Sequence, residues 1–229
     1  MSATPRSAPF PAADVPRLGF AVQSAARVEY AAVPTLRFGL AVESEDDRPV
    51  RSVVLDVQIQ IAARRRPYDA HAHDRLFELF GAPDTWGTTL RTLPWTRTTL
   101  VVAPFTSATV ADLDVPCTYD LEVTASRYFD ALPDGVVPLE FLFSGTVFYT
   151  GAGGMLQTAR ISWESEAEYR LPVAVWRATM DAHFPGTAWL RLPRDAHDRL
   201  CAYKSRHALA TWDDVLDRLL PNEPEDGGA

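Results

Sequence analysis

The chain has 229 residues and a formal net charge of −8, with 47% hydrophobic and 23% charged residues. This length is sufficient to bury a core without disulfides or metals, and the acidic balance argues against general binding to nucleic acid, which is held mainly by pooled positive charge. No apolar run approaches the roughly 20 residues that a membrane helix needs, so we expect no membrane span.

Both ends of the chain have the composition of disordered segments. Residues 1–16 are rich in Ala, Pro and Ser without hydrophobic periodicity, and residues 221–229 are acidic and broken by Pro and Gly. The first segment lacks the apolar region of a secretory signal, and two cysteines are too few for a disulfide framework, which together favour a cytoplasmic protein. Between the ends we expect a single β-rich domain over residues 17–220, with a helical C-terminal part over residues 172–220.

Alternating apolar and polar residues predict most of the strands. Strict alternation marks residues 36–43, 52–63 and 119–125. Residues 136–150 are instead apolar on both sides, which is typical of a central strand covered on both faces. The other expected strands are shorter or weaker, at residues 18–24, 98–105 and 155–163. About seven antiparallel strands indicate a mainly β (α+β) fold, either a sandwich or a curled sheet.

One short helix is expected among the strands and three at the C-terminus. Apolar residues at helical spacing before Gly81, with Asp69 as the N-cap, predict the inserted helix. The C-terminal helices are expected at residues 172–184 after Pro172, at 193–209 with a cap near Asp195, and at 211–220 with a capping box of Thr211 and Asp214. We expect these three to pack on one face or end of the sheet.

Two histidine-containing groups are candidate metal sites. His71 and His73 are two residues apart, which suits a strand, but they lie at the entry of the inserted helix, where such residues point in different directions. A helix entry is therefore the favoured interpretation, and no metal site is predicted. The weaker alternative pair is His197 and Cys201, which share a helix face but need further ligands from elsewhere.

The candidate binding residues are Arg64, Arg65 and Arg66, together with Trp86 and Trp95. The three arginines follow a predicted strand, and their guanidinium groups match carboxylates and phosphates. A solvated strand end that discourages edge pairing is the favoured alternative, because three charges attract little at physiological salt. Most tryptophans are expected in the core or at the helix–sheet seam, and an exposed aromatic patch is the alternative: Trp86, Trp95, Trp163, Trp176, Trp189 and Trp212.

No catalytic constellation is found in the sequence, and no cofactor is expected. Cys117 has no histidine close in sequence, and Ser144 lacks the glycine frame of a nucleophile elbow. A phosphate loop and a dinucleotide fingerprint are also absent from the sequence.

Several phrases, in the same order, resemble an uncharacterised actinobacterial-type family known only as a domain of unknown function. They include "VPTLRFGLAV", "RLFELFG", "PLEFLFSGTVF" and "YRLPVAVWRATMDAHFPGTAWLRL", and the resemblance runs from about residue 18 to residue 220. Genes of this family often lie beside those of nickel–iron hydrogenases and their accessory proteins.

The resemblance therefore implies a non-catalytic interaction or accessory protein for assembly or support of such a redox enzyme. It implies a protein partner and leaves the oligomeric state open. The alternative is a metal-binding protein or hydrolase whose site is assembled by folding from Cys117, His183, His197 or Cys201.

Overall fold

The computed structural model describes residues 15–46, 48–117, 124–151, 153–187 and 192–220. The chain divides into two compact units, Met1–Ala188 and Trp189–Ala229. The first unit contains every described strand, and the second contains the helices α6 and α7. A single domain over residues 17–220 stays a prediction.

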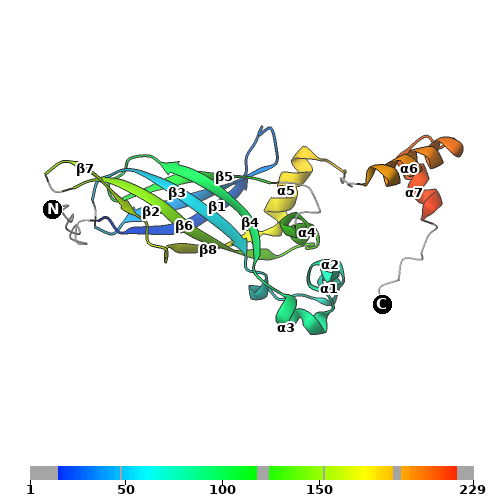
Figure 1. The fold of residues 1–229 in the computed structure, drawn as a ribbon, viewed down its shortest axis with the longest axis horizontal. Helices are drawn as coiled ribbons and strands as arrows, with labels where there is room; N and C mark the ends of the chain where they lie inside the picture. The colour runs from blue at the N-terminus through cyan, green and yellow to red at the C-terminus, as the bar shows by residue number, and fades with distance from the viewer. Residues whose placement is uncertain (1–14, 47, 118–123, 152, 188–191, 221–229) are drawn as a thin grey trace, which may run out of the picture. The chain divides into compact units, whose positions relative to one another are not determined.

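Two antiparallel sheets form the first unit (Figure 1). The smaller sheet has the order β1-β2-β5, with bounds Leu18–Arg27, Thr35–Ser44 and Ala108–Pro116. The larger has the order β4-β3-β6-β7, and β8 also pairs with β6; its bounds are Leu93–Val102, Val50–Ile61, Val136–Thr150, Leu156–Arg160 and Glu166–Pro172. Because β1 lies beside β8 and β4 beside β5, the two sheets curl toward each other at their edges. The expected mainly β sandwich or curled sheet is confirmed.

The core lies between the two sheets, as the alternation of apolar and polar residues along the strands predicted. Phe38 on β2 and Phe141 on β6 are fully buried and meet edge to face with ring centroids 5.2 Å apart. The inward side chains of β2 and β3 are also fully buried: Leu36, Leu40, Val42, Val53, Leu55, Val57, Ile59 and Ile61. Each such side chain contributes about 1.5–3 kcal/mol relative to exposure, so these two strands supply much of the driving force for folding.

Strand β6 is central, as its two apolar faces predicted. It pairs with β3 on one side; on the other, residues 136–142 pair with β8 and residues 146–150 with β7. The change of partner occurs at Gly145, whose φ is 146°. A Cβ there would lie 2.0 Å from the backbone oxygen of Val54, so only glycine fits this close approach of two strands.

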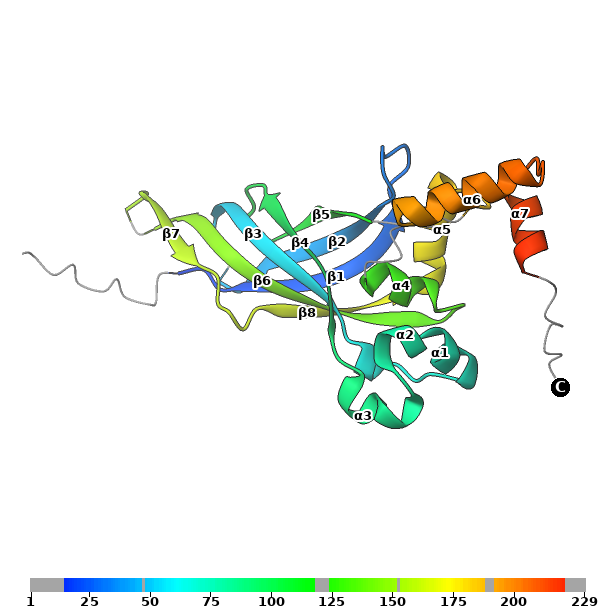
Figure 2. The same cartoon turned by 45° about the vertical axis from the view of Figure 1, so that its right-hand side comes forward.

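The helices of the first unit gather at one end of the sandwich (Figures 1 and 2). Helix α4 (Thr124–Asp130) lies against β4, and α5 (Val173–His183) lies against β1, β2 and β8. The inserted helix is divided into α1 (Ala70–Arg75) and α2 (Phe77–Phe80), and a further short helix that was not predicted, α3 (Trp86–Thr89), follows it. Two predicted boundaries are confirmed, since Asp69 accepts from the N–H of Ala72 at 2.7 Å and Gly81 ends α2 with a φ of 75°. No helix in the described part of the chain is long and apolar enough to cross a membrane.

Some expected elements were wrong or missed. Thr124 and Ala125 were predicted in a strand but begin α4, a helix buried on several sides whose sequence lacks clear helical periodicity. The rest of that predicted strand, residues 119–123, lies outside the described residues. Strands β5 and β8 were not predicted, and β4 begins at Leu93, five residues before its expected start at Thr98, with Pro94 tolerated because β4 is an edge strand.

The terminal predictions fall mostly outside the described residues. Of the lead expected over residues 1–16, the structure describes Val15 and Pro16, and Val15 packs against the core while Pro16 is buried. The expected acidic tail, residues 221–229, is not described.

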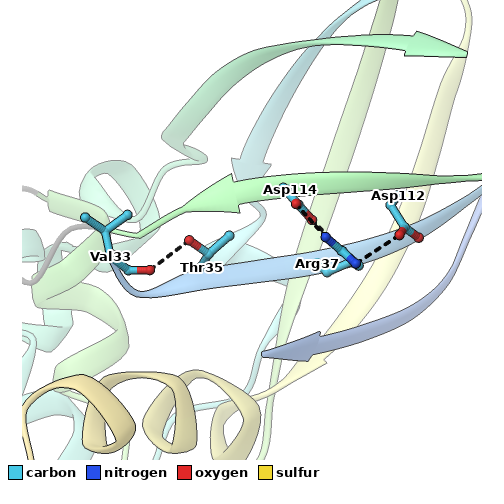
Figure 3. A network of polar contacts seen from close by, with 5 residues as sticks. All are labelled: Val33, Thr35, Arg37, Asp112 and Asp114. Atoms are coloured by element: carbon cyan, nitrogen blue, oxygen red, sulfur yellow. Dashed lines mark hydrogen bonds and ion pairs between the residues drawn. The ribbon is translucent and has the colours of Figure 1, made fainter. Parts of the chain in front are cut away.

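An ion-pair network fastens β2 to β5 on the solvent side of the smaller sheet (Figure 3). Arg37 donates two hydrogen bonds to the carboxylate of Asp114, at 2.6 and 2.7 Å, and its remaining nitrogen lies 3.0 Å from Asp112. The hydrogen bond and charge of Asp114 raise the pKa of Arg37, and Arg37 in turn lowers the pKa of Asp114. These charges therefore persist at ordinary pH and favour the observed strand register.

The second unit is a pair of helices, α6 (Arg194–Arg206) and α7 (Trp212–Leu219). The predicted capping box at the start of α7 is confirmed, with reciprocal bonds between Thr211 and Asp214. Asp195 does not cap α6, because the N-cap is Pro193 and Asp195 lies within the first turn.

Candidate functional site

Of the three consecutive arginines, Arg64 and Arg65 lie in a 3-10 turn, Ala63–Arg65, and Arg66 follows as its C-cap residue, so the run is not at a strand end. Because this turn rotates successive side chains in different directions, each arginine has its own partners. Arg64 donates to the carbonyl oxygen of Leu90 at 2.5 Å, and Arg65 bridges Glu140 and Glu168 at 2.9 and 2.5 Å.

Arg66 binds the backbone at the start of β6. Its two terminal nitrogens donate to the carbonyl oxygens of Val136 and Asp134, each at 2.8 Å. Gly135 between them has a φ of 80°, and a Cβ there would lie 3.2 Å from the guanidinium. The glycine therefore allows the backbone to approach the arginine closely, and the two carbonyl contacts fix the position of the guanidinium.

These contacts bring three arginines to one hollow of about 210 Å³, called here the arginine pocket. Arg170 reaches it from β8, where it stands opposite Pro138 of β6. The complete lining is Arg65, Arg66, Pro67, Gly135, Val136, Pro138 and Arg170. Two of its arginines are adjacent in sequence, whereas the third is supplied by strand pairing.

The charges of the arginine pocket are only partly balanced. Glu168 and Glu140 neutralise Arg65, and the pKa of Arg65 is raised by the hydrogen bond to Glu168 and by both carboxylates. Arg66 has no carboxylate partner in the described part of the chain, and its Nε is buried without a hydrogen-bond acceptor there. The side chain of Arg170 is exposed and forms no hydrogen bond or ion pair with any described residue. The pocket consequently presents a net positive charge on a chain whose total charge is −8.

The chemistry available in the arginine pocket is binding of an anion. Arginine stays protonated at any physiological pH, and its planar fork matches carboxylate and phosphate oxygens. The other lining residues are Pro, Gly and Val, which offer neither a nucleophile nor a general base.

Trp86 and Trp95, the other candidate binding residues, lie in the interior. The indole N–H of Trp86 donates to the carbonyl oxygen of Gly81 at 2.9 Å, and the ring meets that of His73 edge-on at 4.5 Å. Trp95 is half-buried and packs edge to face against Phe129, with ring centroids 5.2 Å apart. Both side chains therefore support the fold.

Trp163 and Trp212, which are not among these candidate binding residues, are exposed. Trp163 is 86% exposed in the loop between β7 and β8, and Trp212 on α7 is 46% exposed, so the expected packing in the core is wrong for these two. Trp189 lies outside the described residues.

A second hollow, of about 770 Å³, lies between the start of β1 and the β7–β8 loop. Its lining has charges of both signs and some hydrophobic side chains; the charged residues are Arg17, Arg160, Glu45, Glu164 and Glu166. This mixture does not select a ligand of one charge. Sequence patterning gave no signal for this hollow, because its lining is assembled from segments far apart in the chain.

The cysteines and histidines considered as an alternative site have local partners. The buried thiol of Cys117 lies 3.4 Å from the carbonyl oxygen of Val115, and burial raises its pKa to about 12, so it is not a thiolate at neutral pH. His183 lies between the carbonyl oxygens of Thr179 and Ala31, at 3.1 Å from each.

His197 and Cys201 do share a face of α6, with Sγ 3.5 Å from Nε2. Within the described ranges, however, no group of three or more His, Cys, Asp or Glu side chains is placed to hold a metal ion. The expected further ligands for this pair are therefore not found in those ranges.

Comparison with solved structures gives only distant likenesses. The ApaA protein from Bordetella pertussis is 11% identical, with a TM-score of 0.25 over 69% of this chain and 93% of that protein. β-Glucosidase 3B from Thermotoga neapolitana is 11% identical at a TM-score of 0.25, over 68% of this chain and 17% of the enzyme. β-Glucosidase from Kluyveromyces marxianus is 6% identical at a TM-score of 0.24, over 68% of this chain and 15% of the enzyme. TM-scores this low do not establish a shared fold.

Sequence comparison identifies the family of this protein. A search among curated proteins finds no match. The model of a family of unknown function, DUF6084, matches residues 15–227, which is nearly the whole chain and covers most of both compact units. The protein therefore belongs to the DUF6084 family, as the resemblance in its sequence implied.

Proposed function

We propose that this protein is a non-catalytic binding protein that holds an acidic segment of a protein partner in its arginine pocket. The observation that carries the proposal is the pair Arg66 and Arg170, which face one hollow without a carboxylate partner among the described residues. A guanidinium group without a carboxylate partner gains favourable binding free energy from an incoming carboxylate, because charge-assisted hydrogen bonds are stronger than neutral ones.

The frame of the arginine pocket supports this proposal. Arg66 is held by two carbonyl groups, and Pro67 and Pro138 restrict the backbone of the walls. A preorganised guanidinium loses little conformational entropy on binding, which favours affinity. The exposed Arg170 completes the contact from β8.

Net charge limits the strength of such binding. At −8 the whole chain repels an acidic partner at long range, so attraction depends on the local arginines. We therefore expect modest affinity that is sensitive to the charge of Arg170 in particular.

The role of the partner follows from the resemblance noted in the sequence. An accessory protein for a cytoplasmic redox enzyme such as a nickel–iron hydrogenase would need no catalytic group of its own, and the lining of the arginine pocket has none. A hydrogenase subunit or maturation factor is accordingly the first partner to test.

The experiment is capture of the tagged full-length protein from its native extract after mild crosslinking, with identification of the bound polypeptides by mass spectrometry. It compares the wild type with Arg170→Glu and with Arg160→Glu, an equal change of charge on the exposed β7 residue Arg160. A partner that is lost with Arg170→Glu and retained with Arg160→Glu supports the proposal. The same partners for all three proteins, or none above background, would count against it.

A further inference from the structure

The C-terminal unit does not by itself cover all of its hydrophobic side chains. On α7 and just after it, Leu216, Leu219 and Leu220 are 50%, 42% and 67% exposed, and Val215 is fully buried. Helix α6 has 13 residues, none of them buried, and α7 has 8. Two helices of this length cannot bury enough apolar surface to be stable alone, so the face formed by these three leucines is suited to a further contact.

A groove of about 490 Å³ lies beside this face. The side chains of Ala196, Leu200 and Tyr203 line it at helical spacing along α6, and Leu219 of α7 adds to them. Arg199 and Arg206 are also part of the lining, and neither has an ion pair with a described residue. The groove thus combines hydrophobic side chains with two cationic ones, which suits an amphipathic helix with acidic residues.

Helix α7 is itself such a helix. It carries Asp213, Asp214 and Asp217 against one basic residue, Arg218, together with the hydrophobic residues Leu216 and Leu219. Helix α6 has the opposite balance, with four basic residues, Arg194, Arg199, Lys204 and Arg206, against Asp195 and Asp198. The two helices are therefore complementary in charge.

Within one chain, α7 already packs on α6 by another side. Val215 is buried, and the ammonium group of Lys204 lies 5.7 Å from the centre of the Trp212 ring. This packing leaves Leu216, Leu220 and the carboxylates of Asp213 and Asp217 for a different α6.

From this complementarity we infer that the C-terminal unit is a dimerisation site, in which α7 of each copy lies in the α6 groove of a second copy of this chain. The arrangement is isologous, since each copy gives an acidic α7 and receives one, so the contact closes at two copies. A stable interface uses roughly 20 residues or more on each side, which is close to all that this unit offers. The dimer should accordingly be in exchange with the monomer.

Sedimentation equilibrium of the full-length protein over a range of concentrations tests the inference. The wild type should fit a monomer–dimer equilibrium, and Leu216→Glu should shift it toward the monomer. Met155→Glu, at an exposed apolar residue of the first unit, should leave it unchanged. A wild type that stays monomeric at the highest concentration reached, as it would if the first unit covered this face, overturns the inference.

Charge reversal provides a test that does not depend on a hydrophobic substitution. One variant carries Asp213→Arg and Asp217→Arg, and the other carries Arg199→Asp and Arg206→Asp. Each alone places like charges at both contacts and should be monomeric, with its helical content checked by circular dichroism. An equal mixture restores opposite charges at one contact and keeps the native pairing at the other, so dimers should return. A mixture that stays monomeric contradicts the inference.

Discussion

The hydroxyl groups of Tyr68 and Tyr128 are 2.6 Å apart. Tyr68 also lies 2.8 Å from the carbonyl oxygen of Ala63, which can only accept. Since a phenol has a single proton to donate, Tyr68 donates to Ala63 and Tyr128 donates to Tyr68. The chain of bonds ties α4 to the turn that contains Arg64 and Arg65, and so stabilises one wall of the arginine pocket.

This direction predicts unequal costs for two similar substitutions. Tyr128→Phe removes one donor and leaves the bond from Tyr68 to Ala63, which should cost about 0.5–1.5 kcal/mol. Tyr68→Phe leaves both the carbonyl oxygen of Ala63 and the fully buried hydroxyl of Tyr128 without this partner, which should cost about 1–3 kcal/mol. Urea unfolding of the two variants measures the difference. Equal losses of stability, or a larger loss for Tyr128→Phe, would contradict this assignment of donors and acceptors.

Alkaline pH should destabilise the fold in part through Cys117. Burial raises the pKa of this thiol from 9.0 to about 12. Between these values the unfolded chain loses the proton while the folded chain keeps it, so stability is fully present below pH 9 and falls as pH rises toward 12. At pH 9.5 the loss due to this group should be about 0.8 kcal/mol relative to neutral pH.

Urea unfolding of the wild type and Cys117→Ala at pH 7.5 and 9.5 checks this dependence. The variant lacks the thiol, so its stability should fall less over the same interval, while the contribution of the tyrosines is common to both proteins. Parallel losses in the two proteins would rule out a raised pKa at Cys117.

The sequence anticipated the fold where alternation is strict and failed where burial removes it. Strand β6 was predicted with its observed bounds, because a strand covered on both faces is continuously apolar. Helix α4 was missed because Ala125, Ser126, Tyr128 and Phe129 are all buried, so its apolar residues do not follow one face. Local signals such as the capping box at Thr211 were predicted correctly, since they depend on neighbouring residues alone.

The candidate site was only partly predictable for a related reason. The arginine run was visible in the sequence, but Arg170 enters the pocket through the pairing of β8 with β6, and β8 itself was not predicted. Likewise, no pattern in the sequence distinguishes the exposed Trp163 from the buried Trp86.

These two tryptophans should respond differently to truncation. Trp86 is 8% exposed and packs among Tyr68, His73 and Phe80, so Trp86→Ala should cost about 3–5 kcal/mol. Trp163 is 86% exposed, so Trp163→Ala should change stability by less than about 0.5 kcal/mol. Thermal unfolding by circular dichroism compares the two. A similar loss for both would contradict the placement of the loop between β7 and β8.

Gly145 should tolerate no side chain. Its φ of 146° and the 2.0 Å approach of a Cβ to the oxygen of Val54 mean that Gly145→Ala must displace β6 or β3. The expected loss exceeds the roughly 1 kcal/mol that an Ala substitution could otherwise gain by restricting the unfolded chain. Gly153→Ala is the control, because a Cβ there meets no atom within 4 Å although the φ of 89° is also positive. If Gly145→Ala is no worse than the control, the strand crossing is not as close as described.

The central claim is that the arginine pocket binds acidic groups, and a direct titration tests it. The probe is a fluorescein-labelled peptide of glutamate residues, and binding to the full-length protein is followed by anisotropy at low and physiological salt. We predict that Arg170→Glu weakens binding about tenfold or more, whereas Arg160→Glu changes it by less than about threefold. Equal weakening by the two substitutions would show that net charge, and not the arginine pocket, governs the contact; no binding to the wild type would contradict the account outright.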